Sequence, residues 1–337
     1  MRAAAVFFIL TATAGAQFKS TTQLVVAPTT VTDEKGRFVD GLTPDDLILT
    51  DNSVRQAIQM DWMTYPIDLV VAVQTSANSG PVIDKLGGAG ILLSQMLAGG
   101  AGETAMISFS DTVKLHQDFT ADPDKVTNAM RMLRMEGGDA HELEAIGQAL
   151  TMLAARPPAR RRIILMIAEK RDRGSDAKLP EVMAKAQRLN AAVYWVTWSP
   201  FLQPFTVKNK VKEDLKPIAA RQPFRACISC PRRDETPVPY EPGPGGLVYA
   251  LGELAHLTQP DLSTLFTETT GGRALGFLKK DALEQAIQLI SLEVHRQYIL
   301  TFQAPVGQPG AFHSIQVTVK GYPKLRVSTR SGYWAVE

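Results

Sequence analysis

Cysteine, net charge and long apolar runs are all scarce in this sequence of 337 residues. Its two cysteines allow at most one intrachain disulfide, and its formal net charge at pH 7 is +2. Such a small charge excludes the global basic character by which many proteins bind nucleic acid. A membrane-spanning helix needs about 20 consecutive apolar residues. No segment after residue 16 is long and apolar enough, so we expect no transmembrane segment in the mature chain.

Motifs of several well-known enzyme classes are also missing. The sequence has no His-Glu-x-x-His zinc motif, no Gly-x-Ser-x-Gly elbow and no phosphate-binding glycine loop. His141, His256 and His295 are far apart in the chain. The glycines of 87–90 fall inside a helical pattern, which predicts close helix packing. We therefore expect a protein that is not an enzyme.

The first sixteen residues have the layout of a secretory signal peptide. Arg2 precedes the apolar run Ala3–Leu10, and the small residues of 14–16 suit a cleavage site. Cleavage after Ala16 removes one positive charge and leaves a formal net charge of +1. The alternative is a buried N-terminal strand or helix. We predict a signal peptide at 1–16 and an exported protein, secreted or periplasmic in a bacterium.

The two ends of the remaining chain are rich in short predicted strands. Residues 17–65 alternate apolar runs with turn signals, for example Leu24–Ala27, Val31–Thr32 and Leu47–Leu49. Residues 298–337 repeat this pattern with period-2 alternation. Each flank is too small to be stable alone. We therefore predict one small β-sandwich formed by both chain ends.

Between these flanks, residues 66–297 alternate predicted strands and helices. Strands are expected at 67–73, 104–109, 112–115, 163–167 and 192–196, with a last short strand at 273–277. Helices are expected at about 81–97, 123–133, 141–155, 179–189, 262–269 and 282–295. This succession predicts an α/β fold, Rossmann-like, with a mostly parallel sheet and helices on both faces.

A Pro-rich basic insertion interrupts this unit at about 200–258. Ten of the 21 prolines of the chain fall between Pro200 and Pro260. Residues 207–233 carry eight Lys and Arg against two acidic residues, a local net charge of +6. The segment is interpreted as a solvated flap or as a contact surface for an anionic polymer, lipid headgroups or an acidic protein.

The same insertion contains Cys227 and Cys230, a Cys-x-x-Cys pair. In an oxidising compartment a short structural disulfide is the leading interpretation. A redox-active pair, a zinc site and two free thiols remain alternatives, although zinc would need two further ligands. If the pair is redox-active, the protein is a thiol-disulfide oxidoreductase.

The strand in Ile67–Ser79 ends in a cluster of small polar side chains. This cluster resembles the Asp-x-Ser-x-Ser start of the metal-ion-dependent adhesion site (MIDAS) of von Willebrand factor A domains. Over about residues 20–200 and 260–335, the chain is similar to the VWFA-related domain family of acidobacterial type. The segments that carry the similarity are 21–36, 39–47, 68–73, the helix that ends at Gly137 and Gly138, 163–175 and 327–333.

The resemblance implies five site positions, which we call the crest: Gln74, Ser76, Asn78, Asp139 and Glu169. Four of the five depart from the family residues, and Ser76 alone retains its own. In the family, these positions hold a divalent cation through oxygen ligands, which suit Mg²⁺. Gln74 offers a neutral carbonyl, whereas Asp139 adds a carboxylate where the family has Thr. We expect a degenerate MIDAS without its usual metal, and Ser76, Asn78 and Asp139 are the weak candidates for Mg²⁺ or Mn²⁺.

By resemblance, the predicted function is that of an exported, non-catalytic interaction or adhesion-type module. The crest is expected to bind a protein or cell-surface partner, with no nucleic acid involved. No cofactor is expected, with Mg²⁺ or Mn²⁺ as the open alternative. The competing class is an exported enzyme, either a thiol-disulfide oxidoreductase using Cys227 and Cys230 or a hydrolase.

Overall fold

The computed structural model describes residues 23–61, 65–76, 79–86, 89–95, 102–198, 261–276, 280–305 and 310–335. The predicted signal peptide, Asn78, the insertion at about 200–258 and both cysteines lie outside the described residues. Within these ranges, no helix is both long and apolar enough to cross a membrane.

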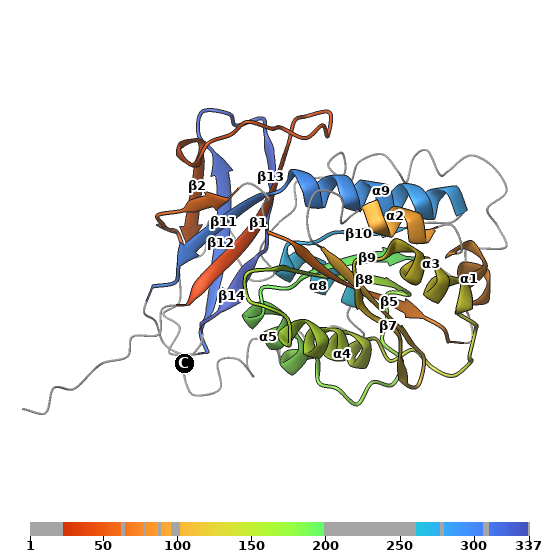
Figure 1. Cartoon of the computed structure of the whole chain (residues 1–337). Helices are drawn as coiled ribbons and strands as arrows, with labels where there is room; N and C mark the ends of the chain where they lie inside the picture. The colour runs from red at the N-terminus through yellow and green to blue at the C-terminus, as the bar shows by residue number, and fades with distance from the viewer. Residues whose placement is uncertain are drawn as a thin grey trace, which may run out of the picture.

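A six-stranded sheet forms the centre of the larger unit (Figure 1). Its strands are β5 (Ile67–Gln74), β6 (Glu103–Phe109), β7 (Val113–Thr120), β8 (Arg161–Ala168), β9 (Ala192–Thr197) and β10 (Ala274–Gly276). They lie in the order β10-β9-β8-β5-β6-β7, and all pairs are parallel except β6 with the edge strand β7. β5 is buried along its whole length. Its nearly continuous apolar sequence is typical of a central parallel strand, which is covered on both faces.

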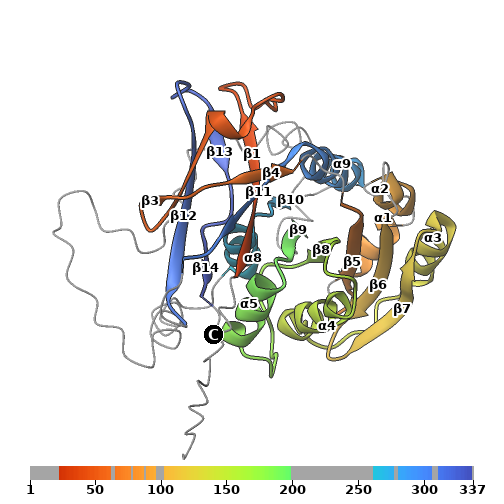
Figure 2. The same ribbon diagram turned by 60° about the vertical axis from the view of Figure 1, so that its left-hand side comes forward.

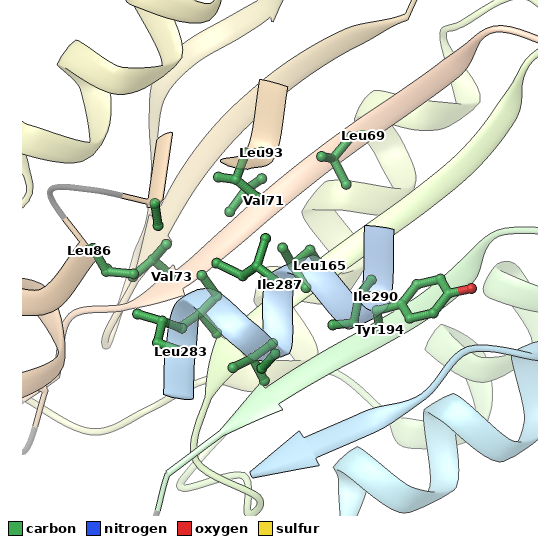
Figure 3. Packing of buried hydrophobic residues seen from close by; sticks show 14 of the residues in the cluster. Leu69, Val71, Val73, Leu86, Leu93, Leu165, Tyr194, Leu283, Ile287 and Ile290 are labelled. Carbon is green, nitrogen blue, oxygen red and sulfur yellow. The ribbon is translucent and has the colours of Figure 1, made fainter. Parts of the chain in front are cut away.

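Helices cover both faces of this sheet, as Figures 1 and 2 show. One face carries α1 (Gly80–Leu86), α2 (Ala89–Gln95), α3 (Pro123–Met132) and α9 (Lys280–Arg296). The other carries α4 (Glu142–Ala154), α5 (Leu179–Arg188) and α8 (Leu262–Thr270). Figure 3 shows side chains of α9, Ile287 among them, packed against Val71 and Leu165 of the sheet. The predicted α/β class with a mostly parallel sheet is therefore confirmed.

The helix predicted over 81–97 is wrong in one respect, because α1 and α2 are separate helices. Gly87 and Gly88 stand between them in the sequence, and glycine has poor helix propensity. The expected close packing is confirmed at Gly90, where an added Cβ would lie 2.8 Å from the Thr127 Cα of α3.

Asp122 caps α3 as its position predicts, since its Oδ1 accepts a 2.9 Å hydrogen bond from the Asp124 N–H.

Both chain ends contribute strands to a β-sandwich of two four-stranded antiparallel sheets. The first sheet has the order β13-β1-β11-β4, with β13 (Arg326–Ser328), β1 (Leu24–Thr32), β11 (Tyr298–Gln303) and β4 (Gln59–Asp61). The second has the order β14-β12-β2-β3, with β14 (Gly332–Trp334), β12 (Phe312–Val319), β2 (Leu47–Asp51) and β3 (Val54–Arg55). The predicted sandwich is confirmed, and the two runs predicted within residues 24–32 form one strand, β1.

Buried polar side chains join the sandwich to the α/β unit. Arg330 has almost no exposed surface and donates hydrogen bonds to the Val26 carbonyl and to Asn190 Oδ1, both at 3.1 Å. Asn190, which follows α5, has a positive φ of 50°. In α9, Glu293 forms an ion pair with Arg273 and accepts a 3.4 Å hydrogen bond from the Thr30 hydroxyl of β1. These contacts hold the crest-bearing unit in one orientation against the sandwich.

Candidate functional site

The crest lies where the strand order of the sheet reverses. From β5 the chain adds β6 and β7 on one side and then continues with β8, β9 and β10 on the other. Ligands of open α/β sheets bind outside the carboxyl ends of the strands at such a switch point. Gln74 ends β5 and Glu169 follows β8, so the structure places these two predicted site residues at the switch point.

Three segments form the described part of this surface: 74–76 after β5, 134–141 before α4 and 169–175 after β8. Backbone hydrogen bonds connect them. The Glu136 N–H donates to the Thr75 carbonyl at 2.8 Å, and the Arg173 N–H donates to the Ala140 carbonyl at 2.8 Å. The three crest segments are therefore one connected structure, although they are up to about a hundred residues apart in sequence.

The Gln74 side chain bridges two of these segments. It is 1% exposed, and its Oε1 accepts a 2.7 Å hydrogen bond from the Glu169 N–H. Its Nε2 donates to Ser76 Oγ at 2.6 Å. An amide can donate and accept at the same time, whereas a carboxylate can only accept. Gln74 thus stabilises the ends of β5 and β8, at a position where the resemblance implies a metal-binding Asp.

Glu169 is also engaged within the protein. Its side chain is buried, and Oε2 accepts a 2.8 Å hydrogen bond from the Arg173 guanidinium. Its backbone carbonyl accepts a 3.1 Å hydrogen bond from the Trp195 indole N–H. The other carboxylate oxygen, Oε1, is buried and has no hydrogen-bond partner among the described residues. Arg173 therefore balances the charge of Glu169, while one oxygen stays unpaired.

Asp139 lies at the rim of the crest with an exposed side chain. Its backbone N–H donates to Asp111 Oδ1 at 2.6 Å. Gly138 has a positive φ of 76°, and an added Cβ there would lie 2.2 Å from Asp111 Oδ2. The loop therefore wraps around the Asp111 carboxylate. In the part of the chain that is described, the Asp139 carboxylate itself has no hydrogen bond.

Two acidic residues of the site were not predicted from the sequence, Glu142 and Asp172. Glu142 begins α4, has no exposed surface, and neither of its carboxyl oxygens has a hydrogen-bond partner within the described ranges. Asp172 Oδ1 accepts hydrogen bonds from the Ser175 hydroxyl at 2.5 Å and from the Leu143 N–H at 3.3 Å. Helical spacing is the sequence signal that could have identified Glu142 as buried. This residue precedes the buried Ile146 by one turn, on the apolar stripe of α4.

The pKa of Glu142 is raised from 4.5 to about 10, chiefly by burial and in addition by the negative charges of Asp172 and Glu169. Desolvation disfavours the ionised form of a carboxyl, and like charges nearby have the same effect. Without a bound cation, Glu142 is therefore protonated at neutral pH and stays neutral inside the crest.

The described crest positions do not fit the metal-binding role that the family implies. Gln74 and Ser76 are hydrogen-bonded to each other, and Glu169 is paired with Arg173. Nor do the residues that the structure describes include a group of three or more His, Cys, Asp or Glu side chains arranged to hold a metal ion. At position 74, where the resemblance implies a metal-binding Asp, the Gln amide forms a hydrogen-bonded bridge.

No family model and no curated protein matches the chain. Among solved structures, it is similar to the vWF domain of the type V pili tip protein Mfa5 from Porphyromonas gingivalis, at 18% identity and a TM-score of 0.29. That match covers 33% of this chain and 40% of the Mfa5 chain, less than half of its length.

Two other similar structures are matched over nearly their whole length. An aerotolerance-related membrane protein from Bacteroides fragilis has 12% identity and a TM-score of 0.39, covering 67% of this chain and 99% of that one. BatB from Bacteroides thetaiotaomicron has 14% identity and a TM-score of 0.37, with the same coverages of 67% and 99%. At such identities a likeness concerns the fold alone. The strand order, the antiparallel edge strand and the two helix layers agree with the fold that the sequence resemblance implied.

Proposed function

We propose that this protein is an exported, non-catalytic interaction or adhesion-type module that binds a protein or cell-surface partner through the crest, without the family's usual metal ligands. The observation that carries the proposal is the position of the crest at the switch point of the sheet. Binding sites in this architecture depend on loops held by rigid strands, and the three crest segments have that support.

The crest presents side chains of the kinds that protein interfaces use. Asp139, Arg171 and Arg173 are exposed, and Met135 has 53% of its surface exposed. Arg and Met are enriched at protein interfaces relative to the rest of a protein surface. Met135 lies over the start of α1, since its sulfur would be 3.4 Å from a Cβ added at Gly80. The surface therefore combines opposite charges with an accessible apolar side chain.

The opposite end of β5 has a different character. Asp68 is buried and forms ion pairs with Arg156 at 3.0 Å and with Arg160 at 2.7 Å. Arg156 also pairs with Glu103 at 2.8 Å. These charges neutralise one another within the protein and stabilise the end of the sheet opposite the crest. This contrast favours the crest as the binding surface.

The proposal is tested by capturing partners from the native envelope fraction with the purified mature protein as bait. The crest variant Asp139→Asn/Arg173→Gln is compared with Arg188→Gln, which changes an exposed charge at the far end of α5. We expect mass spectrometry to identify the same captured proteins with the wild type and with Arg188→Gln, and their loss with the crest variant. Equal capture by the crest variant would contradict binding at the crest.

One observation bears on the hydrolase alternative. Ser108 Oγ lies 2.7 Å from His116 Nε2, a distance suited to a nucleophile and its general base. Ser108, however, has no exposed surface, so a substrate could not reach its hydroxyl in this conformation. This burial favours a structural role for the pair.

The redox alternative depends on Cys227 and Cys230, which lie outside the described residues. An insulin-reduction assay tests it directly. Activity that disappears in Cys227→Ser would overturn the non-catalytic proposal, whereas no activity in the wild type would remove this alternative.

A further inference from the structure

Exposed methionine is concentrated at one edge of the crest. The structure describes buried or half-buried methionines at positions 60, 106, 130, 152, 166 and 183. Among the described methionines, Met132 and Met135 alone are exposed, with 73% and 53% of their surface in solvent. Met132 ends α3, and Met135 lies three residues later in crest segment 134–141. Their thioethers are therefore the ones that a dissolved oxidant reaches first, since susceptibility to oxidation follows exposure.

The Met135 side chain also connects two elements. Its sulfur would lie 3.4 Å from a Cβ added at Gly80, the first residue of α1. The sulfur therefore occupies the side that a larger residue at position 80 would fill with its own side chain. An apolar contact thus joins segment 134–141 to α1, while more than half of the Met135 surface stays in solvent.

The residues on either side of Met135 are anchored. Leu133 before it is buried. The Glu136 N–H after it donates to the Thr75 carbonyl at 2.8 Å, and the Glu136 carboxylate pairs with Lys114 at 2.8 Å. A change in the Met135 side chain therefore acts directly beside the hydrogen bond that holds this segment to the chain after β5.

We propose that Met135 is a site of reversible oxidation by peroxides, and that its oxidation loosens segment 134–141 of the crest. With hydrogen peroxide, the sulfur attacks one peroxide oxygen, the O–O bond breaks and a sulfur–oxygen bond forms. The sulfur loses two electrons, and the departing hydroxide takes the proton of the transferred oxygen and leaves as water. A sulfoxide reductase reverses the change, as two thiols become a disulfide and the oxygen leaves as water.

The consequence for the crest follows from the polarity of the product. Methionine sulfoxide is polar, and it disrupts the apolar contacts that methionine makes. The oxidised side chain therefore turns from Gly80 to water, and the neighbouring hydrogen bond from Glu136 to Thr75 opens more often. An effect on partner binding rests on the proposed function, because the crest must then be the binding surface.

The first test treats the purified mature protein with limiting hydrogen peroxide and locates added oxygen by peptide mass spectrometry. The variant is Met135→Leu, which keeps an apolar side chain of similar volume that peroxide does not oxidise. Met132→Leu is the matched control, since Met132 is exposed as well but belongs to α3. We expect oxidation of Met132 and Met135 in the wild type before that of the buried Met130 and Met166.

Hydrogen exchange of segment 134–141 then measures how often the crest opens. After oxidation, we expect exchange to become about tenfold faster or more in the wild type and in Met132→Leu, and to stay unchanged in Met135→Leu. Treatment with methionine sulfoxide reductase and a thiol should restore the original rate. Unchanged exchange in the oxidised wild type, equal acceleration in Met135→Leu, or no recovery after reduction would each overturn the proposal. So would a peroxide dose that oxidises Met132 and leaves Met135 intact.

Partner capture supplies a further readout. Oxidised wild type should capture less of each partner than untreated wild type, and oxidised Met135→Leu should capture as much as before treatment. Equal capture by oxidised and untreated wild type would overturn an effect of Met135 on binding. A wild type that captures nothing before oxidation contradicts the proposed function instead, and the exchange measurement, which needs no partner, still decides whether Met135 controls the crest.

Discussion

Gln74 shows how one amide side chain can connect two strand ends. The amide accepts from the Glu169 N–H and donates to Ser76 Oγ, so it satisfies groups on both sides of the switch point. A carboxylate at this position could accept but not donate. It would also add a negative charge beside the buried Glu169. The amide therefore suits a position whose side chain must both accept and donate a hydrogen bond.

Replacing Gln74 by Glu keeps the side-chain length but removes the donor and adds a buried charge. We expect Gln74→Glu to lower the free energy of unfolding by about 1–3 kcal/mol, the typical cost of an unsatisfied buried group. Urea unfolding at pH 7 measures this loss. The control is Gln148→Glu, an exposed position on α4, which should change stability by less than about 0.5 kcal/mol. Equal effects at both positions would contradict the bridging role.

Glu142 makes the stability of the protein depend on pH. Its pKa is 4.5 ordinarily and about 10 in the folded protein, so the native state holds one more proton than the unfolded state between these values. The contribution of this group to stability is therefore complete below pH 4.5 and is lost as pH rises through about 10. The slope from one proton is about 1.4 kcal/mol per pH unit.

We expect Glu142→Gln to remove this slope. In metal-free buffer the variant should gain stability over the wild type with each pH unit from 5 to 9, because a neutral amide needs no proton. Guanidinium unfolding at several pH values measures the difference. Parallel stability curves for the two proteins would show that Glu142 is not protonated in the folded state.

At the scale of elements, the contact between α2 and α3 depends on a glycine. A Cβ added at Gly90 would lie 2.6 Å from Thr127 Oγ1 and 2.8 Å from Thr127 Cα, so the two helices would have to separate. The backbone contact cannot be relieved by rotating a side chain. Overpacking of this kind typically costs about 1–3 kcal/mol.

We therefore expect Gly90→Ala to destabilise the protein by about 1–3 kcal/mol, although alanine is the better helix former. Gly147 of α4 is the matched control, since an added Cβ there meets nothing within 4 Å. Gly147→Ala should raise stability by about 0.5–1 kcal/mol. Thermal unfolding compares the two variants, and a Tm increase in both would show that α2 and α3 are not closely packed.

At the scale of the whole molecule, Arg330 connects the sandwich to the α/β unit. Burial lowers the pKa of its guanidinium to about 10. The group donates to Val26 and Asn190, and its Nε donates to the Gly332 carbonyl at 2.9 Å. The chain thus uses hydrogen bonds to carbonyl and amide oxygens to keep a buried cation at the junction.

We expect Arg330→Ala to lower the free energy of unfolding by about 3 kcal/mol or more, because it leaves several buried acceptors unsatisfied and opens a cavity. Arg188→Ala, at an exposed position of α5, is the control and should have little effect. Chemical unfolding measures both. A small effect of Arg330→Ala would show that the junction contributes little to stability.

The sequence by itself determined the class of fold and most of its elements. The apolar run of β5, the period-2 alternation of β12 and the stripe of α4 are local patterns, and local patterns follow from the geometry of strands and helices. The contributions of both chain ends to one sandwich also followed, because neither flank could bury a core alone. The break between α1 and α2 was missed, since one apolar stripe continues across both helices.

The chemistry of the crest was decided by the tertiary structure alone. The sequence pointed to the carboxyl end of β5, and the structure brings Gln74 and Glu169 together there. It leaves Asp139 at the rim and instead places Glu142 beside Asp172, thirty residues away in the chain. Hydrogen bonding and burial depend on which side chains meet in space, and spacing along the chain does not encode that. The physical reason is that β5 and β8 are neighbours only because the sheet reverses its strand order between them.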